Sequence, residues 1–191
     1  MKKWICALAL SAVSSAVFAN SWNVNDADSR VSFVSVKKGD IGEVHYFKQV
    51  SGSLDDAGKF ELTIPLSSVQ TGVTIRDERM QSMLFEVAQF PSLTLTSSVD
   101  IAAVKGLAVG DTMVTEIEGQ VSLHGQSQSK HFPVLVAKLS DSKLVVTSLQ
   151  PVIVNASEFN LVAGIEKLRE VAGLTAISQA VPVSFVLTLS K

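Results

Sequence analysis

Hydrophobic and polar residues alternate with a period of two along most of this chain. The clearest run lies at residues 60–66, where Phe60, Leu62, Ile64 and Leu66 are separated by more polar neighbours. This alternation is typical of a β-strand with one buried face. Comparable runs predict about eight strands, at residues 22–36, 43–54, 60–66, around 93–95, 113–125, 131–139, 144–154 and 181–190. Strands at this spacing favour an up-and-down antiparallel barrel.

Two segments follow the 3.6-residue period of a helix instead. The first stripe recurs at i, i+3, i+4, i+7 and i+10 and consists of Met80, Met83, Leu84, Val87 and Phe90. It predicts an amphipathic helix that Pro91 ends. The second stripe, Leu161, Ile165, Leu168 and Ala172, predicts another short helix before the last strand. Residues 105–111 are expected to form a loop, and residues 125–130 a turn. The fold class is therefore mainly all-β, with two short helices.

The first nineteen residues have the three parts of a secretory signal. Lys2 and Lys3 precede an apolar stretch at residues 4–13, and small residues end at Ala19. We expect cleavage after Ala19, which leaves residues 20–191 as a single domain in the periplasm or outside the cell. Cys6 is the only cysteine, and its place in the signal predicts a mature protein without a disulfide.

Charge and motifs exclude several functional classes. The chain has 16 Lys and Arg against 18 Asp and Glu, without a basic patch, so we do not expect nucleic-acid binding. No nucleophile elbow or phosphate-binding loop is present. The three histidines, His45, His124 and His131, lack the spacing of metal ligands, and we expect no metal site. The sequence therefore predicts a protein that is not an enzyme.

Several segments resemble the YceI-like family of periplasmic proteins. They are DSRVSF at 28–33, IPLSSVQTG at 64–72, RDERM at 76–80, LFEVAQFPSLTLTS at 84–97 and the weaker LHG at 123–125. The resemblance implies a lipocalin-like antiparallel β-barrel that holds a long isoprenoid or similar lipid. Residues 155–178 depart from the family pattern, because a helical segment replaces a short strand that carries an asparagine–arginine pair in many members.

This resemblance gives the inward-facing residues a functional interpretation as the lining of a lipid cavity, with the Met80–Phe90 helix at its mouth. Flexible thioethers and phenyl rings suit a long apolar ligand. The expected lining is Phe33, Phe47, Leu62, Ile64, Leu66, Met80, Met83, Leu84, Phe90, Leu95, Ile117, Val121, Phe185 and Leu187. Arg76, Asp77 and Arg79 could hold a ligand head group at the mouth. A structural role for these charges, at a helix start, is the favoured alternative.

The expected function is therefore that of a binding or carrier protein for a long-chain lipid, such as an isoprenoid quinone or a polyprenyl chain, with no other cofactor. Aliphatic contacts discriminate poorly between such ligands, so the sequence does not separate a quinone from a polyprenyl phosphate or a fatty acid. Transient membrane contact and a dimeric state are both compatible with this function. The alternative is a ligand-free interaction protein with a solidly packed barrel.

Overall fold

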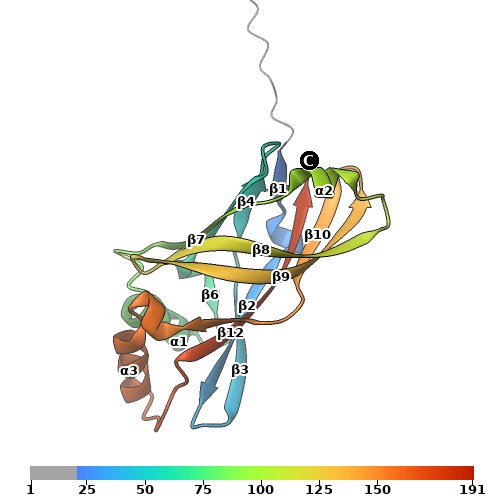
Figure 1. Cartoon of the computed structure of the whole chain (residues 1–191). Coiled ribbons are helices and arrows are strands. Elements are labelled where there is room, and N and C mark those ends of the chain that lie inside the picture. Colours follow the sequence, from blue (N-terminus) through green and yellow to red (C-terminus); the bar gives the residue numbers. More distant parts are fainter. Residues whose placement is uncertain (1–20) are drawn as a thin grey trace, which may run out of the picture.

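The structure is a computed structural model that describes residues 21–191. The expected signal at residues 1–19 lies outside this range. The described chain forms a closed, eight-stranded antiparallel β-barrel with a few short helices (Figure 1). This confirms the fold class predicted from the alternation of hydrophobic residues. Helices α1 (Thr74–Arg79) and α3 (Val162–Val171) lie at one end of the barrel, and helix α2 (Ile101–Gly106) lies at the other end, near the C-terminus.

Several strands of the barrel wall are interrupted by short turns. In chain order the elements of the first half are β1 (Trp22–Val24), the 3₁₀ turn η1 (Asp26–Asp28), β2 (Arg30–Lys37), β3 (Ile41–Phe47), β4 (Ser51–Leu54), β5 (Lys59–Pro65), η2 (Leu66–Ser68) and β6 (Val69–Gln70). The second half contains β7 (Ser92–Ser98), β8 (Thr112–Leu123), β9 (Gln126–Ser140), β10 (Lys143–Ser148), β11 (Val152–Asn155), η4 (Ala156–Phe159) and β12 (Ala180–Ser190). The predicted strands at 22–36, 43–54 and 144–154 are thus each split in two.

The last strand closes the barrel. Strand β12 pairs antiparallel with β10 on one edge, and with β1 and then β2 on the other. The break at η1 lets the first strand bend, so that Val24 lies opposite Leu189 while Phe33 lies opposite Val183. Because side chains alternate across each strand, this closed ladder directs one face of every strand to a common interior.

The first helical segment differs from its prediction. It consists of α1 (Thr74–Arg79) and the π-helical turn η3 (Met80–Leu84), so it begins earlier and ends well before Pro91. The amide of Phe85 donates to the carbonyl of Met80, five residues back, at 2.9 Å. This wider turn shifts the helical phase, so Phe85 is buried beside Leu84. Glu86 then adopts a left-handed φ of 48°, which ends the helix.

Two further elements refine the prediction. The segment that follows β7 forms helix α2 (Ile101–Gly106), which the sequence did not predict and which overlaps the expected loop at 105–111 only at residues 105–106. The side chain of Asp100 caps this helix by accepting from the amides of Ala102 and Ala103. The hairpin between β8 and β9 turns at His124 and Gly125, which both have positive φ, rather than over residues 125–130. The predicted second helix is present as α3 (Val162–Val171).

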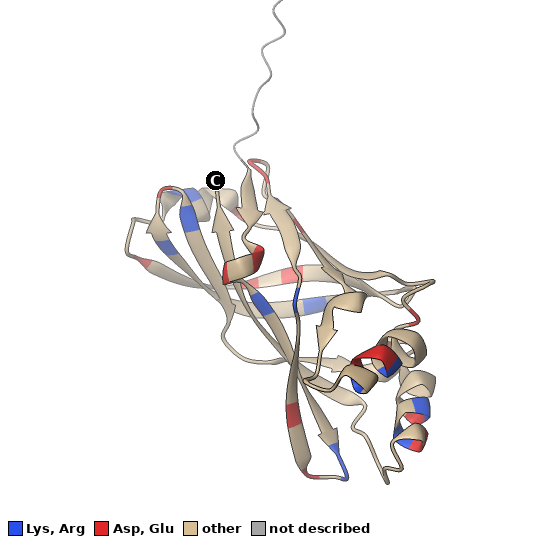
Figure 2. Ribbon diagram, turned by 180° about the vertical axis from the view of Figure 1, so that it is seen from behind, with Lys and Arg blue, Asp and Glu red and all other residues tan. Residues whose placement is uncertain are grey.

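Charged residues are frequent around the end of the barrel where α1 and α3 lie. Figure 2 shows them on these two helices and near the tip of the β2–β3 hairpin. Among residues 21–191, no helix is both long and apolar enough to cross a membrane.

Candidate ligand-binding cavity

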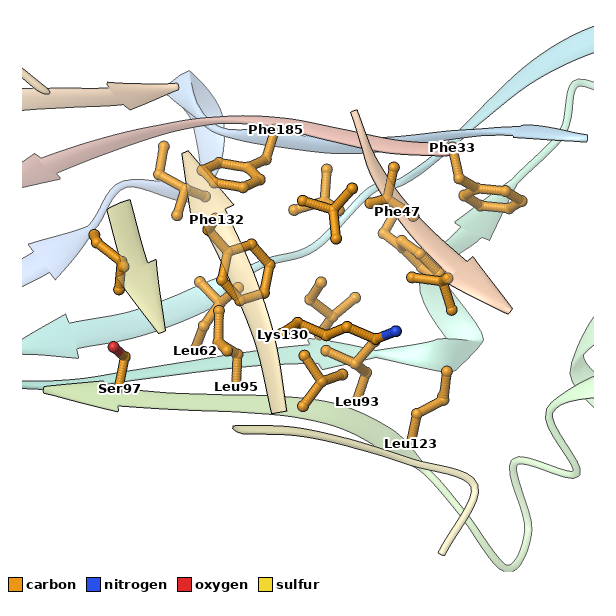
Figure 3. Close-up of a pocket in the computed structure, with 18 of the residues that line it drawn as sticks. Phe33, Phe47, Leu62, Leu93, Leu95, Ser97, Leu123, Lys130, Phe132 and Phe185 are labelled. Carbon is orange, nitrogen blue, oxygen red and sulfur yellow. The ribbon is translucent and has the colours of Figure 1, made fainter. Parts of the chain in front are cut away.

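The inward faces of the strands surround a cavity of about 220 Å³ inside the barrel (Figure 3). Leu62, Leu95, Phe132 and Phe185, from four different strands, project into it. The rings of Phe132 and Phe185 meet edge to face, with their centroids 6.2 Å apart. Of the described residues that line this cavity, only Ser97 and Lys130 carry polar side chains. The interior can therefore hold an apolar chain away from water.

Most of the residues expected in the cavity do line it, together with many that were not expected. Twelve of the fourteen expected residues line the cavity: Phe33, Phe47, Leu62, Ile64, Leu66, Met80, Leu84, Leu95, Ile117, Val121, Phe185 and Leu187. Met83 and Phe90 lie outside it. Met83 lies outside because the π-helical turn changes the helical phase, so that Phe85 lines the cavity instead.

Phe90 instead fastens the loop after η3 to the β8–β9 hairpin. Its ring lies on the imidazole of His124, with a centroid distance of 4.3 Å. His124 Nε2 also lies 2.9 Å from Oε2 of Glu86. The ring packs close to Gly125, where an added Cβ would lie 3.1 Å from Phe90 Cε1. Phe90 therefore packs outside the cavity, between the loop after η3 and the β8–β9 hairpin.

Helical segments cover the two ends of the cavity. Val104 of α2 lines one end. Met80 and Leu84 on η3 and the adjoining Phe85 share the other end with Ile165 of α3. The helices η3 and α3 touch where Gly164 meets the backbone of Leu84. We call η3 and α3 the helical lid.

The charges of the RDERM segment hold helix α1 in place. Arg76 Nη1 donates to Oε2 of Glu43 at 2.7 Å, and its Nη2 donates to the carbonyl of Thr71 at 2.7 Å. Asp77 accepts from the amide of Thr71 at 2.8 Å and from Gln70 Nε2 at 3.2 Å. Arg76, Asp77 and Arg79 all lie outside the cavity lining. These contacts support the structural interpretation of the three charged residues.

The same corner contains an unusual buried histidine. His45 is only 2% exposed, and its Nδ1 has no hydrogen-bond partner among residues 21–191. Burial, together with the positive charge of Arg76, lowers the pKa of His45. Lys37, which hydrogen-bonds to Glu43, and the nearby Arg76 lower the pKa of that carboxyl. Within the described chain, no group of three histidine, cysteine or acidic side chains could hold a metal ion.

Two lining residues that the sequence interpretation missed are Phe132 and Lys130 on β9. Both continue the inward alternation of Val134 and Val136. Phe132 already lay within the predicted strand at 131–139, and Lys130 would have joined the same face had that strand been extended past His131. Phe85 carried no such signal, because its burial depends on the π-helical turn.

Comparison with known proteins decides the family. Residues 22–189 match the YceI-like domain. The chain belongs to the YceI-like family. A solved structure similar to it is that of a polyisoprenoid-binding domain from Saccharophagus degradans implicated in plant cell wall breakdown. That domain is 39% identical, with a TM-score of 0.87, and the match covers 88% of this chain and 97% of that one.

Two more distant structures support the fold alone. Burkholderia cenocepacia BcnA is 22% identical with a TM-score of 0.64, and the match covers 86% of this chain and 98% of that one. A Campylobacter jejuni YCEI protein is 16% identical with a TM-score of 0.57, covering 77% of this chain and 84% of that one. A comparison with curated proteins found no match.

Proposed function

We propose that this protein is a periplasmic carrier that holds an isoprenoid-type or similar long-chain lipid inside its barrel. The observation that carries the proposal is the apolar cavity at the centre of the fold. The similarity to a polyisoprenoid-binding domain supports an isoprenoid as the ligand, and the expected signal sequence supports the periplasm. The proposal involves no catalysed reaction.

The physical basis is the removal of a long apolar chain from water. Each methylene that leaves water contributes roughly 0.8 kcal/mol. A few prenyl units therefore outweigh the cost of association, even though the contacts themselves discriminate little between chains. A carrier of this kind would shield the lipid while it moves between membranes, and release it on transient contact with a membrane surface.

Native mass spectrometry of protein purified from periplasmic extract tests the proposal. A co-purifying lipid, released by organic solvent and identified by mass, is the expected result. The delipidated protein should then take up a fluorescent polyene lipid. Empty protein from repeated purifications that also fails to take up the probe would instead support the packed-barrel alternative.

A matched pair of variants on strand β8 links uptake to the cavity. Ile117 lines the cavity, whereas Val114 points outward and is 67% exposed. Ile117→Trp fills interior space without adding charge and should reduce probe uptake several-fold. Val114→Trp adds the same side chain on the outer face and should leave uptake unchanged. Equal uptake by the two folded variants would argue against the interior as the binding site.

A further inference from the structure

Lys130 is the one charged residue that lines the apolar cavity within residues 21–191. It lies on β9, in the inward series that continues with Phe132 and Val134. Its side chain is only 14% exposed. Figure 3 shows it extended among the apolar side chains of the lining. A lysine in such a place is rare unless its charge is compensated.

Glu158 on η4 provides that compensation. Lys130 Nζ donates to Oε2 of Glu158 at 2.6 Å. The carboxylate is fixed in turn, because it caps η4 together with Asn155, whose amide lies 3.3 Å from the same oxygen. Gln128, one inward position before Lys130, donates from Nε2 to the Glu158 carbonyl at 3.2 Å. The hydrogen bond from Lys130 lowers the pKa of Glu158, so this carboxylate supplies the negative charge of the salt bridge.

This pairing leaves hydrogen-bonding capacity on Lys130. An ammonium group has three N–H donors, and Glu158 is the one hydrogen-bond partner of Lys130 Nζ among the described residues. A further N–H can therefore be offered to an oxygen atom inside the barrel. In surroundings that are otherwise apolar, such a hydrogen bond is stronger than in water.

We propose that Lys130 anchors the head group of the bound lipid, and that this head group is a neutral hydrogen-bond acceptor such as a carbonyl oxygen. A neutral acceptor can use a free N–H of Lys130 while the ion pair stays intact. A carboxylate or phosphate would be repelled by the negative charge of Glu158, whose side chain is 32% exposed at the edge of the cavity lining, and would have to displace it from Lys130. The inference rests on the proposed lipid-binding function and narrows its ligand class.

Three ligands with the same hydrocarbon chain test the inference: oleate, methyl oleate and the corresponding alkene. They compete with a fluorescent hydrocarbon probe, diphenylhexatriene, in the delipidated full-length mature protein at mildly alkaline pH. The wild-type protein should bind methyl oleate more tightly than oleate. Lys130→Met should lower the affinity for methyl oleate, relative to the affinity for the alkene, by about tenfold. This factor is the lower end of what a hydrogen bond to a charged group contributes.

Two further variants make the test specific. Glu158→Gln keeps the capping interaction, since glutamine also serves at this position, but leaves the charge of Lys130 uncompensated. This variant should bind oleate more tightly than methyl oleate, which inverts the wild-type order. Lys138→Met is the control, because Lys138 lies on the same strand with a side chain that is 13% exposed, but outside the cavity lining. Lys138→Met should keep the wild-type order of affinities, with methyl oleate bound more tightly than oleate.

The outcomes separate this inference from the proposed function. Lys130 is not the head-group anchor if Lys130→Met keeps the wild-type ratio of the affinities for methyl oleate and the alkene. The same conclusion holds if Glu158→Gln does not bind oleate more tightly than methyl oleate. In both cases the barrel still binds lipid. If neither the probe nor any of the three ligands binds to the wild-type protein, the proposed function itself fails, and the inference fails with it.

Discussion

Gly164 is the point at which the two halves of the helical lid meet, and its replacement by alanine tests how closely they are packed. A Cβ at this position would lie 2.8 Å from Cα of Leu84 and 2.8 Å from the carbonyl oxygen of Met83. Ordinary contacts begin at about 3.4 Å. Since both obstructing atoms belong to the backbone, α3 and η3 must separate by roughly 0.6 Å, which a change of side-chain rotamer cannot provide.

The magnitude follows from two opposing effects. Alanine in place of glycine within a helix is stabilising by up to about 1 kcal/mol. Overpacking costs typically about 1–3 kcal/mol, and backbone obstruction places this site in the upper half of that range. Gly164→Ala should therefore lower the free energy of unfolding by about 1–2 kcal/mol. For a domain of this size, this corresponds to a Tm that is lower by roughly 2–8 °C.

Gly106, the last residue of α2, provides a matched control. An added Cβ there meets nothing within 4 Å, so Gly106→Ala should be neutral or stabilising by up to about 1 kcal/mol. Thermal and urea unfolding of both variants measure the difference, and release of a bound fluorescent lipid should be faster for Gly164→Ala, because the lid is held less tightly. A Gly164→Ala protein as stable as Gly106→Ala, with an unchanged release rate, would refute the close packing of the lid.

Three further predictions concern other parts of the molecule. Because burial lowers the pKa of His45 below 6.5, the unfolded chain binds a proton more readily, so stability should fall as pH drops below about 6.5. His45→Phe should flatten this dependence of urea unfolding on pH, and parallel curves for variant and wild type would exclude His45 as its source. Arg76→Met removes two hydrogen bonds that hold α1 against the barrel. Because Arg76 is partly exposed, the free energy of unfolding should fall by only about 1 kcal/mol. An unchanged urea midpoint would show that α1 is held by its apolar contacts. N-terminal sequencing of protein recovered from a periplasmic extract should begin at Asn20, whereas recovery of the intact leader would contradict cleavage after Ala19.

Much of the barrel and a part of its cavity lining were predictable from sequence alone. The alternation in β5 and β12 defines which residues share a face, because the pleat of a strand places every second side chain on the same side. That local rule was sufficient to predict the inward orientation of four residues that line the cavity, Leu62, Ile64, Phe185 and Leu187. The stripe from Leu161 to Ala172 likewise predicted α3, because a 3.6-residue period requires no knowledge of the partner surface.

The tertiary structure decided the features that depend on contacts between distant segments. Phe85 replaces Met83 in the lining because a π-helical turn shifts the phase of η3, and the hydrophobic period of the sequence continues through that turn without a break. Lys130 is an interior residue because Glu158, twenty-eight positions later, neutralises its charge. Sequence periodicity specifies the face on which a side chain lies, whereas closure of the barrel through β1 and β12 determines what that face meets.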